Sequence, residues 1–198
     1  MKNKEVDRLL STIPDNYTLA KQILELLNNK NTKVQIKDDI KGNYYTFVND
    51  TIYISSKASN ASNDNGPIVI AHECRHSIQN KKIQLVNTVI SNIVLFLIVL
   101  SVILIFFNID ITILLIISTS LNIVIREYLE LDATYNSLKI LLEYISKYHN
   151  SLNINDIYDY YFKKIKLALV LYFFKIIFDK FLPIIVIFII KIVKNHIF

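Results

Sequence analysis

The sequence has few of the residues that end helices or cross-link a chain. Among its 198 residues are 2 glycines, 3 prolines and 1 cysteine. A soluble globular domain needs glycine and proline at its turns, so their scarcity, beside a hydrophobic content of 53%, argues against a freely soluble protein. That apolar content also excludes intrinsic disorder. Cys74 has no second cysteine to pair with, which excludes a disulfide-stabilised secreted scaffold.

The charge balance is basic. Lysine and arginine number 22, against 17 aspartates and glutamates, which gives a net charge of +5. Such an excess suits either nucleic acid or anionic lipid headgroups. Because the basic residues are scattered along the chain, we expect a lipid bilayer as partner and no nucleic acid. Five of the first eight residues are charged and no apolar segment follows them, so no cleavable secretory signal is predicted.

Two apolar segments predict a transmembrane hairpin. Residues 83–109 contain no charged side chain, and about 20 helical residues suffice to cross the apolar core of a bilayer. Residues 111–125 form a second, shorter uncharged run, and Asp110 separates the two. Lys82 and Arg126 flank the open end of the hairpin, so the positive-inside rule predicts that this end faces the cytoplasm.

Charges interrupt a third apolar segment, residues 167–190. Lys175 and Asp179 stand four residues apart, so on a helix they can pair and reduce the cost of burying them in lipid. The segment either crosses the bilayer as a third span or lies obliquely in it. The tyrosines and lysines of residues 158–166 are typical of an anchor at the membrane interface, and equally of a packed helical domain.

The N-terminal 82 residues predict a small α+β unit. Asp15 or Asn16 can cap a helix that carries apolar residues on one face. Alternating apolar and polar residues predict three strands: residues 33–37, 44–48 and 51–54. The dipeptide Asn49-Asp50 lies between the last two and predicts a hairpin turn.

A polar loop over residues 55–65 leads into the helix that carries the chemistry. Asp64 or Asn65 can serve as its N-cap, and Pro67 suits its first turn. The helix is predicted to run from Ile68 to about Lys82.

His72 and His76 stand four residues apart on this helix. Their imidazoles therefore leave the same face and can bind one metal ion. Glu73, next to His72, can take a proton from a metal-bound water and pass it to a leaving amine. Zinc suits two imidazoles and lowers the pKa of bound water to about 7. The pattern predicts hydrolysis of a peptide bond, with Zn²⁺ as cofactor and a polypeptide as substrate.

A catalytic zinc takes three protein ligands, and these histidines supply two. His149 lies at a predicted helix end and His196 near the C-terminus, so we expect both in solvent. The better source is the acidic segment after the hairpin, because the chain returns there to the side of the membrane that it left. Glu130 or Glu127 would complete a site of two histidines and one glutamate.

The order of these motifs resembles that of the neutral zinc metallopeptidases of bacterial membranes, which are gluzincin-like proteins. Those proteins have a His-Glu-x-x-His helix and, after membrane-spanning sequence, the motif Glu-x-Asp-Ala-Ser. The matching residues here are His72-Glu73-Cys74-Arg75-His76-Ser77-Ile78-Gln79 and Glu130-Leu131-Asp132-Ala133-Thr134. The resemblance covers about residues 17–140. It implies that Glu130 is the third zinc ligand and that Glu73 is the general base.

The resemblance has one further implication, and the sequence departs from the family at one position. Residues 52–54 look like the strand that precedes the active-site helix in that family, which implies that they pair with an extended substrate as an added strand. Arg75 stands where the family has glycine, and its cation either repels zinc or pairs with Asp132. Asp132 is a candidate partner for a ligating histidine, fixing its tautomer.

We therefore expect an α+β membrane protein of four parts. These are a zincin-like α+β unit with the His-Glu-x-x-His helix (1–82), a transmembrane hairpin (83–125), a helical segment that completes the metal site (126–166) and an apolar C-terminal helix that is a candidate third span (167–198). The expected function is that of a multi-pass zinc metallopeptidase of the bacterial cell membrane, with its site on the cytoplasmic side. Two alternatives stay open: a zinc-binding membrane protein without activity, and a hydrophobic membrane protein, such as a holin-like protein or a small transport accessory, in which the histidine pair is accidental.

Overall fold

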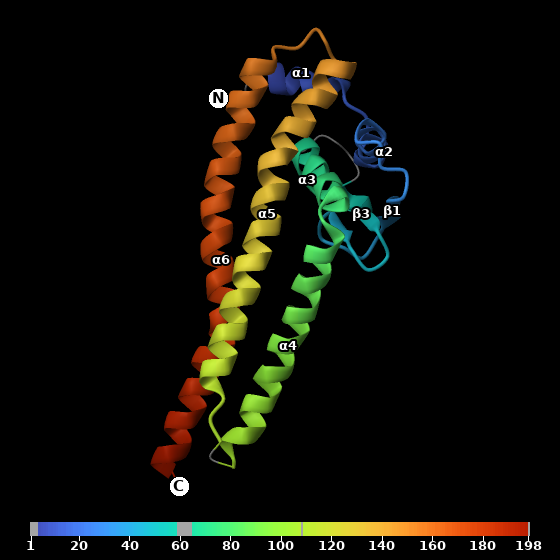
Figure 1. Ribbon diagram of the computed structural model, residues 1–198. Helices are drawn as coiled ribbons and strands as arrows, with labels where there is room; N and C mark the ends of the chain where they lie inside the picture. The colour runs from blue at the N-terminus through green and yellow to red at the C-terminus, as the bar shows by residue number, and fades with distance from the viewer. Residues whose placement is uncertain (1–3, 59–64, 108, 198) are drawn as a thin grey trace. The chain divides into compact units, whose positions relative to one another are not determined.

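The computed structural model describes residues 4–58, 65–107 and 109–197, and side chains as far as residue 194. The chain is mostly helical, with one small sheet (Figure 1). Its helices are α1 (Lys4–Thr12), α2 (Asn16–Leu26), α3 (Gly66–Ile78), α4 (Lys81–Ile105), α5 (Thr112–Tyr148) and α6 (Ile154–Ile197). Its strands are β1 (Lys33–Lys37), β2 (Tyr44–Thr46) and β3 (Thr51–Ser55), and a single 3-10 turn, η1 (Ser56–Ala58), follows β3.

The chain forms two compact units. Unit 1 joins Met1–Lys81 to Glu130–Ala168, and unit 2 joins Lys82–Leu129 to Leu169–Phe198. Helices α5 and α6 each contribute to both units. Helix α5 continues without interruption past residues 125 and 126, where the sequence changes from apolar to charged, and α6 continues past residues 166 and 167, where it changes back.

The sheet of unit 1 has the strand order β1-β3-β2, with β3 parallel to β1 and antiparallel to β2. The three predicted strands and the hairpin are confirmed. Strand β2 ends at Thr46, two residues earlier than predicted, because the chain turns back over residues 47–50 and Asp50 adopts a left-handed φ of 48°. The expectation that residues 52–54 pair with a substrate strand is wrong, because β3 is the central strand and both of its edges are already paired.

Helices α2 and α3 supply much of the core of unit 1. Asp15 caps α2, since its Oδ1 accepts hydrogen bonds from the backbone N–H groups of Tyr17 and Thr18 at 2.9 and 3.0 Å. The fully buried apolar side chains of these two helices and of β3 include Leu19, Ala20, Ile23, Ile52, Ile54, Ile70, Ala71 and Cys74. This packing fixes α3 against the sheet, and α3 is the helix that carries the two histidines.

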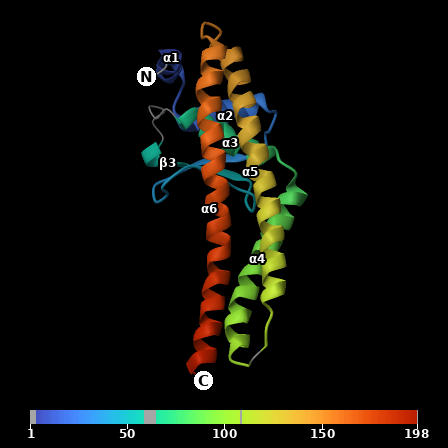
Figure 2. The same ribbon diagram turned by 90° about the vertical axis from the view of Figure 1, so that its left-hand side faces the viewer.

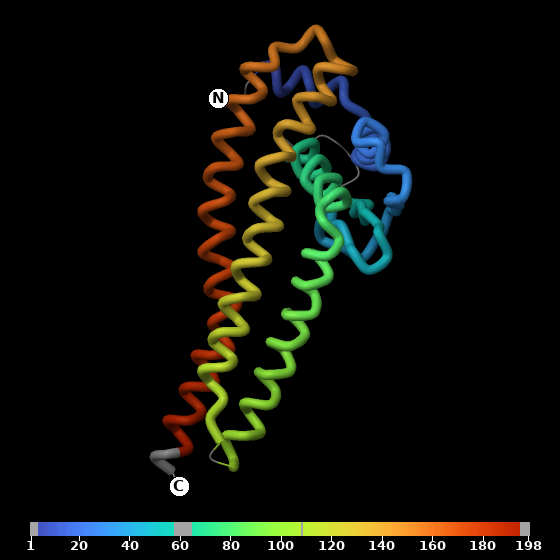
Figure 3. The backbone as a smooth tube through the Cα atoms, viewed as in Figure 1, coloured from blue at the N-terminus to red at the C-terminus, as the bar shows by residue number. Residues whose placement is uncertain are grey.

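Helix α3 is shorter than the sequence predicts at its C-terminal end. It stops at Ile78, and Gln79 takes an extended conformation with φ −65° and ψ 162° before α4 begins at Lys81. Figure 3 follows the backbone through this interruption. At the other end Asn65 occupies the N-cap position but makes no capping hydrogen bond through its side chain, and Asp64 lies outside the described residues.

Unit 2 consists of α4, the first part of α5 and the last part of α6, which lie side by side (Figures 1 and 2). An apolar cluster joins the three helices: Val94, Leu97, Ile105, Leu115, Ile184 and Ile187. At the turn between α4 and α5, Lys191 of α6 pairs with Asp110 at 2.5 Å and donates to Thr112 Oγ1 at 2.8 Å. Among the residues that the structure describes, two helices, α4 and α5, are long and apolar enough to cross a membrane.

Candidate metal centre

Three side chains of unit 1 converge on one point. His72 and His76 lie one turn apart on α3, and Glu130 projects from α5. The two Nε2 atoms are 3.0 Å apart, and Glu130 Oε2 lies 3.4 Å from His72 Nε2 and 3.7 Å from His76 Nε2. Ligand atoms that share a tetrahedral zinc at about 2.0–2.1 Å are themselves about 3.3 Å apart. The three side chains and their spacing could therefore hold a metal ion, and they are of the types that zinc takes as ligands.

The other candidate ligands are not part of this group. Within the described part of the chain, the group whose ligand atoms all lie within 4.8 Å of one another consists of His72, His76 and Glu130, and it does not include Glu127. His149 does not stand free in solvent as expected: it is half-buried against the ring of Tyr144, and burial lowers its pKa. The side chain of His196 lies outside the described residues.

The electrostatic environment lowers the pKa of Glu130 and raises that of His76. Burial by itself would raise the pKa of the Glu130 carboxyl, but hydrogen bonds and charge from the two imidazoles hold it well below its usual range. Burial also disfavours the charged form of His76, yet the neighbouring Glu130 carboxylate raises the pKa of His76 above 6.5. Glu130 is therefore an ionised ligand at any physiological pH, whereas His76 holds a proton more tightly than a free imidazole does.

Glu73 faces the sheet. Its Oε2 accepts a hydrogen bond of 2.7 Å from the backbone N–H of Tyr45 in the edge strand β2. Burial raises the pKa of Glu73, against the lowering effect of the two nearby histidines. A carboxylate with a raised pKa is a stronger base than an exposed one, which suits a residue that must accept and release a proton.

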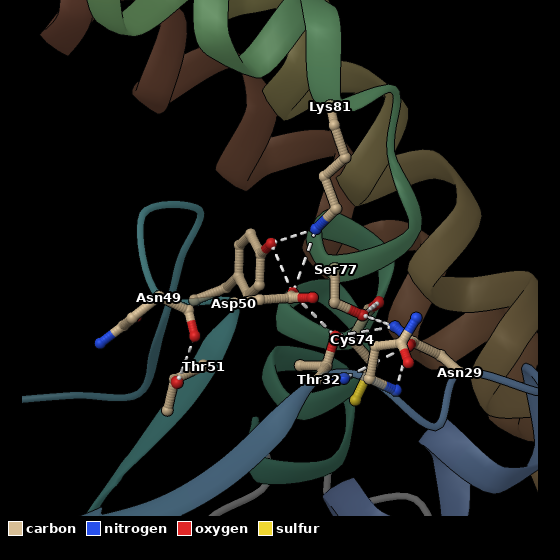
Figure 4. A network of polar contacts seen from close by, with 10 residues as sticks. Asn29, Thr32, Asn49, Asp50, Thr51, Cys74, Ser77 and Lys81 are labelled. Carbon is tan, nitrogen blue, oxygen red and sulfur yellow. Dashed lines mark hydrogen bonds and ion pairs between the residues drawn. The ribbon is translucent and has the colours of Figure 1, made fainter.

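A polar network holds β2 beside Glu73. Asp50 accepts hydrogen bonds from Thr32 Oγ1 and Tyr45 Oη, both at 2.9 Å, and pairs with Lys81 at 3.1 Å (Figure 4). Lys81 also donates to the hydroxyl of Tyr45. Asn29 Nδ2 donates to Thr32 Oγ1 and to Ser77 Oγ of α3. Because Thr32 also donates to Asp50, these bonds link the β2–β3 hairpin to α3. These bonds offset the strain of the left-handed Asp50, about 1 kcal/mol or more. The sequence marks Asp50 only as a turn residue, so this role was missed.

Arg75 pairs with Asp132. Its Nε and Nη2 atoms donate to the two carboxylate oxygens at 3.0 and 2.9 Å. Of the two effects considered for Arg75, repulsion of zinc or pairing with Asp132, the structure shows the pairing. Asp132 reaches His76 through an intermediate, Gln79: His76 Nδ1 lies 2.8 Å from Gln79 Oε1, and Gln79 Nε2 donates to Asp132 Oδ2 at 2.8 Å. The sequence marks Gln79 only as the last residue of the quoted histidine motif, so its contact with His76 was missed.

The second histidine has a different partner. The Nδ1 atom of His72 lies 3.2 Å from Thr134 Oγ1, one turn along α5 from Glu130. His72 Nδ1 therefore contacts α5 directly, whereas His76 Nδ1 reaches α5 only through Gln79. The Nε2 atoms of both imidazoles face one another. Outer partners of this kind orient the ligands of metal sites.

Comparisons with models of protein families, with curated proteins and with solved structures found no match to this chain. What the site can do is therefore inferred from its own residues. It offers three converging side chains that could hold a metal ion, a half-buried carboxylate beside them and hydrogen-bonded partners for each imidazole.

Proposed function

We propose that this chain is a membrane-embedded zinc metallopeptidase. The observation that carries the proposal is the convergence of His72 Nε2, His76 Nε2 and Glu130 Oε2, at spacings of 3.0 to 3.7 Å, next to the half-buried carboxylate of Glu73. Zinc bound there would polarise the scissile carbonyl and acidify water. The pairing of Arg75 with Asp132 supports activity, because the guanidinium charge is matched by a carboxylate.

In this proposal Glu73 handles the protons of the reaction. It accepts a proton from the attacking water and delivers it to the nitrogen of the leaving amine. The backbone N–H of Tyr45 fixes one oxygen of the carboxylate, so the orientation of Glu73 depends on the position of β2. The substrate is accordingly a peptide bond of a polypeptide.

We infer further that unit 2 lies in the bilayer. Its helices expose many large apolar side chains that water would disfavour: Leu95, Phe96, Phe106, Ile113, Ile117, Phe174 and Phe178. The last part of α6 packs on α4 and α5 through Ile184 and Ile187, which supports a third span. The basic residues Lys82 and Arg126 at the open end of the hairpin support the cytoplasmic orientation.

The proposal is tested by measuring metal and activity together. We expect about one zinc per chain in detergent-purified protein by mass spectrometry, and cleavage of an unfolded protein such as casein. A chelator should remove both, and added zinc should restore both. The control is the same treatment with magnesium in place of zinc. Protein that binds no zinc even after reconstitution would contradict the proposal and leave the hydrophobic membrane protein as the better interpretation.

Zinc affinity should depend on pH in a defined direction. Zinc binds the neutral imidazole, so it must displace the proton that Glu130 helps His76 to hold. We therefore expect the affinity to be constant above the raised pKa of His76 and to fall below it, by about tenfold per pH unit for one displaced proton. Glu130 adds nothing to this slope near neutrality, because its pKa is lowered. Competitive zinc titrations at several pH values measure it, and a flat profile would contradict the assignment of His76.

A further inference from the structure

Gln79 lies between the histidine face of α3 and the acidic motif of α5. It is the C-cap residue of α3, and its side chain is buried at 6% exposure. The two ends of its amide have different partners: Oε1 lies 2.8 Å from His76 Nδ1, and Nε2 donates to Asp132 Oδ2 at 2.8 Å. The amide is therefore a bridge whose direction matters, because one end can only accept hydrogen bonds and the other can only donate them.

Asp132 determines the direction of this bridge. An ionised carboxylate is an acceptor only, with about four lone-pair sites. Four donors point at Asp132: Arg75 Nε and Nη2, Gln79 Nε2, and Asn136 Nδ2 at 2.9 Å. Arg75 cannot lose its proton, so the carboxylate stays paired with a cation. The NH₂ group of Gln79 must then face Asp132, which leaves its carbonyl oxygen facing His76.

The carbonyl oxygen in turn determines the tautomer of His76. Since Oε1 can only accept, Nδ1 must carry the proton at a distance of 2.8 Å. A neutral imidazole has one proton, so Nε2 is left with its lone pair. Nε2 is the atom that lies 3.0 Å from His72 Nε2 and 3.7 Å from Glu130 Oε2. Arg75 thus sets the polarity of a chain of hydrogen bonds that ends at a candidate metal ligand.

His72 lacks such a constraint. Its Nδ1 partner is the hydroxyl of Thr134, which can donate or accept. In the metal-free protein Nε2 of His72 can therefore carry a proton and donate towards Glu130 or His76. The two histidines therefore differ: the tautomer of His76 is fixed before metal binds, whereas His72 can change its tautomer when metal binds.

We propose that Gln79 is a positioning residue for the metal centre: with Asp132 and Arg75 behind it, Gln79 holds His76 in the tautomer that presents the Nε2 lone pair to the ion. This inference rests on the zinc site of the proposed function. It concerns the preparation of one ligand, which can be observed without metal. Loss of an outer partner of a ligating histidine typically lowers metal affinity by about 10–100-fold.

The first test reads the tautomer directly in metal-free protein. The chain has 4 histidines, so ¹⁵N-histidine labelling gives few NMR signals, which His→Gln variants assign. At alkaline pH the wild-type His76 should show a protonated Nδ1 and an unprotonated Nε2. Gln79→Met, which keeps the length of the side chain without the amide, should produce a mixture of tautomers. Asp132→Asn should shift His76 the same way, because an amide at position 132 no longer imposes the direction of Gln79.

The second test measures zinc affinity in the same variants. Gln79→Met and Asp132→Asn should each weaken zinc binding by about 10–100-fold. The control is Gln22→Met, which removes another glutamine of unit 1 whose Oε1 accepts from Tyr144 Oη, and which should leave both the His76 tautomer and zinc affinity unchanged. Circular dichroism shows whether each variant is folded.

The outcomes separate this inference from the proposed function. A wild-type His76 with its proton on Nε2, or an unchanged tautomer and affinity in folded Gln79→Met and Asp132→Asn, would overturn the role of Gln79 even if zinc binds. The expected tautomer in a wild-type protein that binds no zinc would uphold the hydrogen-bond chain and overturn the metallopeptidase instead.

Discussion

Replacing Glu73 with glutamine should lower peptidase activity by about 10²–10⁴-fold and leave zinc bound. The amide keeps the shape of the side chain and an oxygen that can accept the Tyr45 N–H, so the local structure should persist. It cannot take a proton from the attacking water, however, and general base catalysis contributes about 10²–10⁴-fold to such rates. We therefore expect the turnover of Glu73→Gln to fall by about that factor, measured on the casein used for the wild type.

The matched control for this variant is Glu25→Gln on α2, an exposed glutamate outside the metal group. It should have wild-type activity and zinc content. A folded, zinc-loaded Glu73→Gln that still cleaves casein would show that another group is the base. If it lost its zinc as well, Glu73 would be needed to hold the site together rather than to move protons.

The sequence predicts those parts of the site that depend on local spacing. Two histidines four residues apart must share a helix face, and the helix itself follows from its apolar neighbours. The convergence of Glu130 on them was expected from chain topology together with the family resemblance, and α5 does bring it within 3.7 Å of both Nε2 atoms. Helix periodicity could not choose between Glu127 and Glu130, which are one turn apart. Three-dimensional packing makes that choice.

What the sequence could not predict depends on where elements end and which side chains meet between them. Helix α3 ends at Ile78, whereas a helix to about Lys82 was expected. Gln79 therefore lies in extended backbone, where its side chain contacts His76 and Asp132 of α5. The central position of β3 follows from strand order, which alternation in a sequence does not reveal. The bonds of Asp50 to Tyr45 and Lys81 join residues up to 31 positions apart. No local pattern marks such partners.

The apolar helices were predictable for a different reason. Length and lack of charge suffice to identify α4 and the start of α5, because each property is carried by the segment itself. The charged residues of α6 obscure the same signal there. Two of these charges have specific partners at the α4–α5 turn: Lys191 pairs with Asp110, and Lys194 donates to the carbonyl oxygen of Ile105 at 2.5 Å. A mean hydropathy taken over a stretch of sequence counts such lysines as unfavourable in a membrane, although their amino groups have polar partners.

Removing any one of the three proposed ligands should cost more zinc affinity than removing Gln79. His72→Ala, His76→Ala and Glu130→Ala each delete an atom that would contact the ion, so we expect the affinity to fall by more than the roughly 100-fold upper limit for an outer partner. Purified variants should then contain well under one zinc per chain, measured by mass spectrometry. The control is Glu127→Ala, one turn from Glu130 on α5 and outside the ligand group, which should keep its zinc.

Two substitutions of Glu130 distinguish the effect of its negative charge from the effect of its ligand oxygen. Glu130→Gln keeps an oxygen at nearly the same place but removes the negative charge that raises the pKa of His76. That loss should lower the pKa of His76 in metal-free protein and move the fall in zinc affinity to lower pH, while affinity at high pH is weakened by the poorer ligand. Glu130→Ala should show the same shift in pKa with a larger loss of affinity. Zinc retained in Glu130→Ala would instead place the third ligand on another residue, and an unchanged His76 titration would contradict the contact between the two side chains.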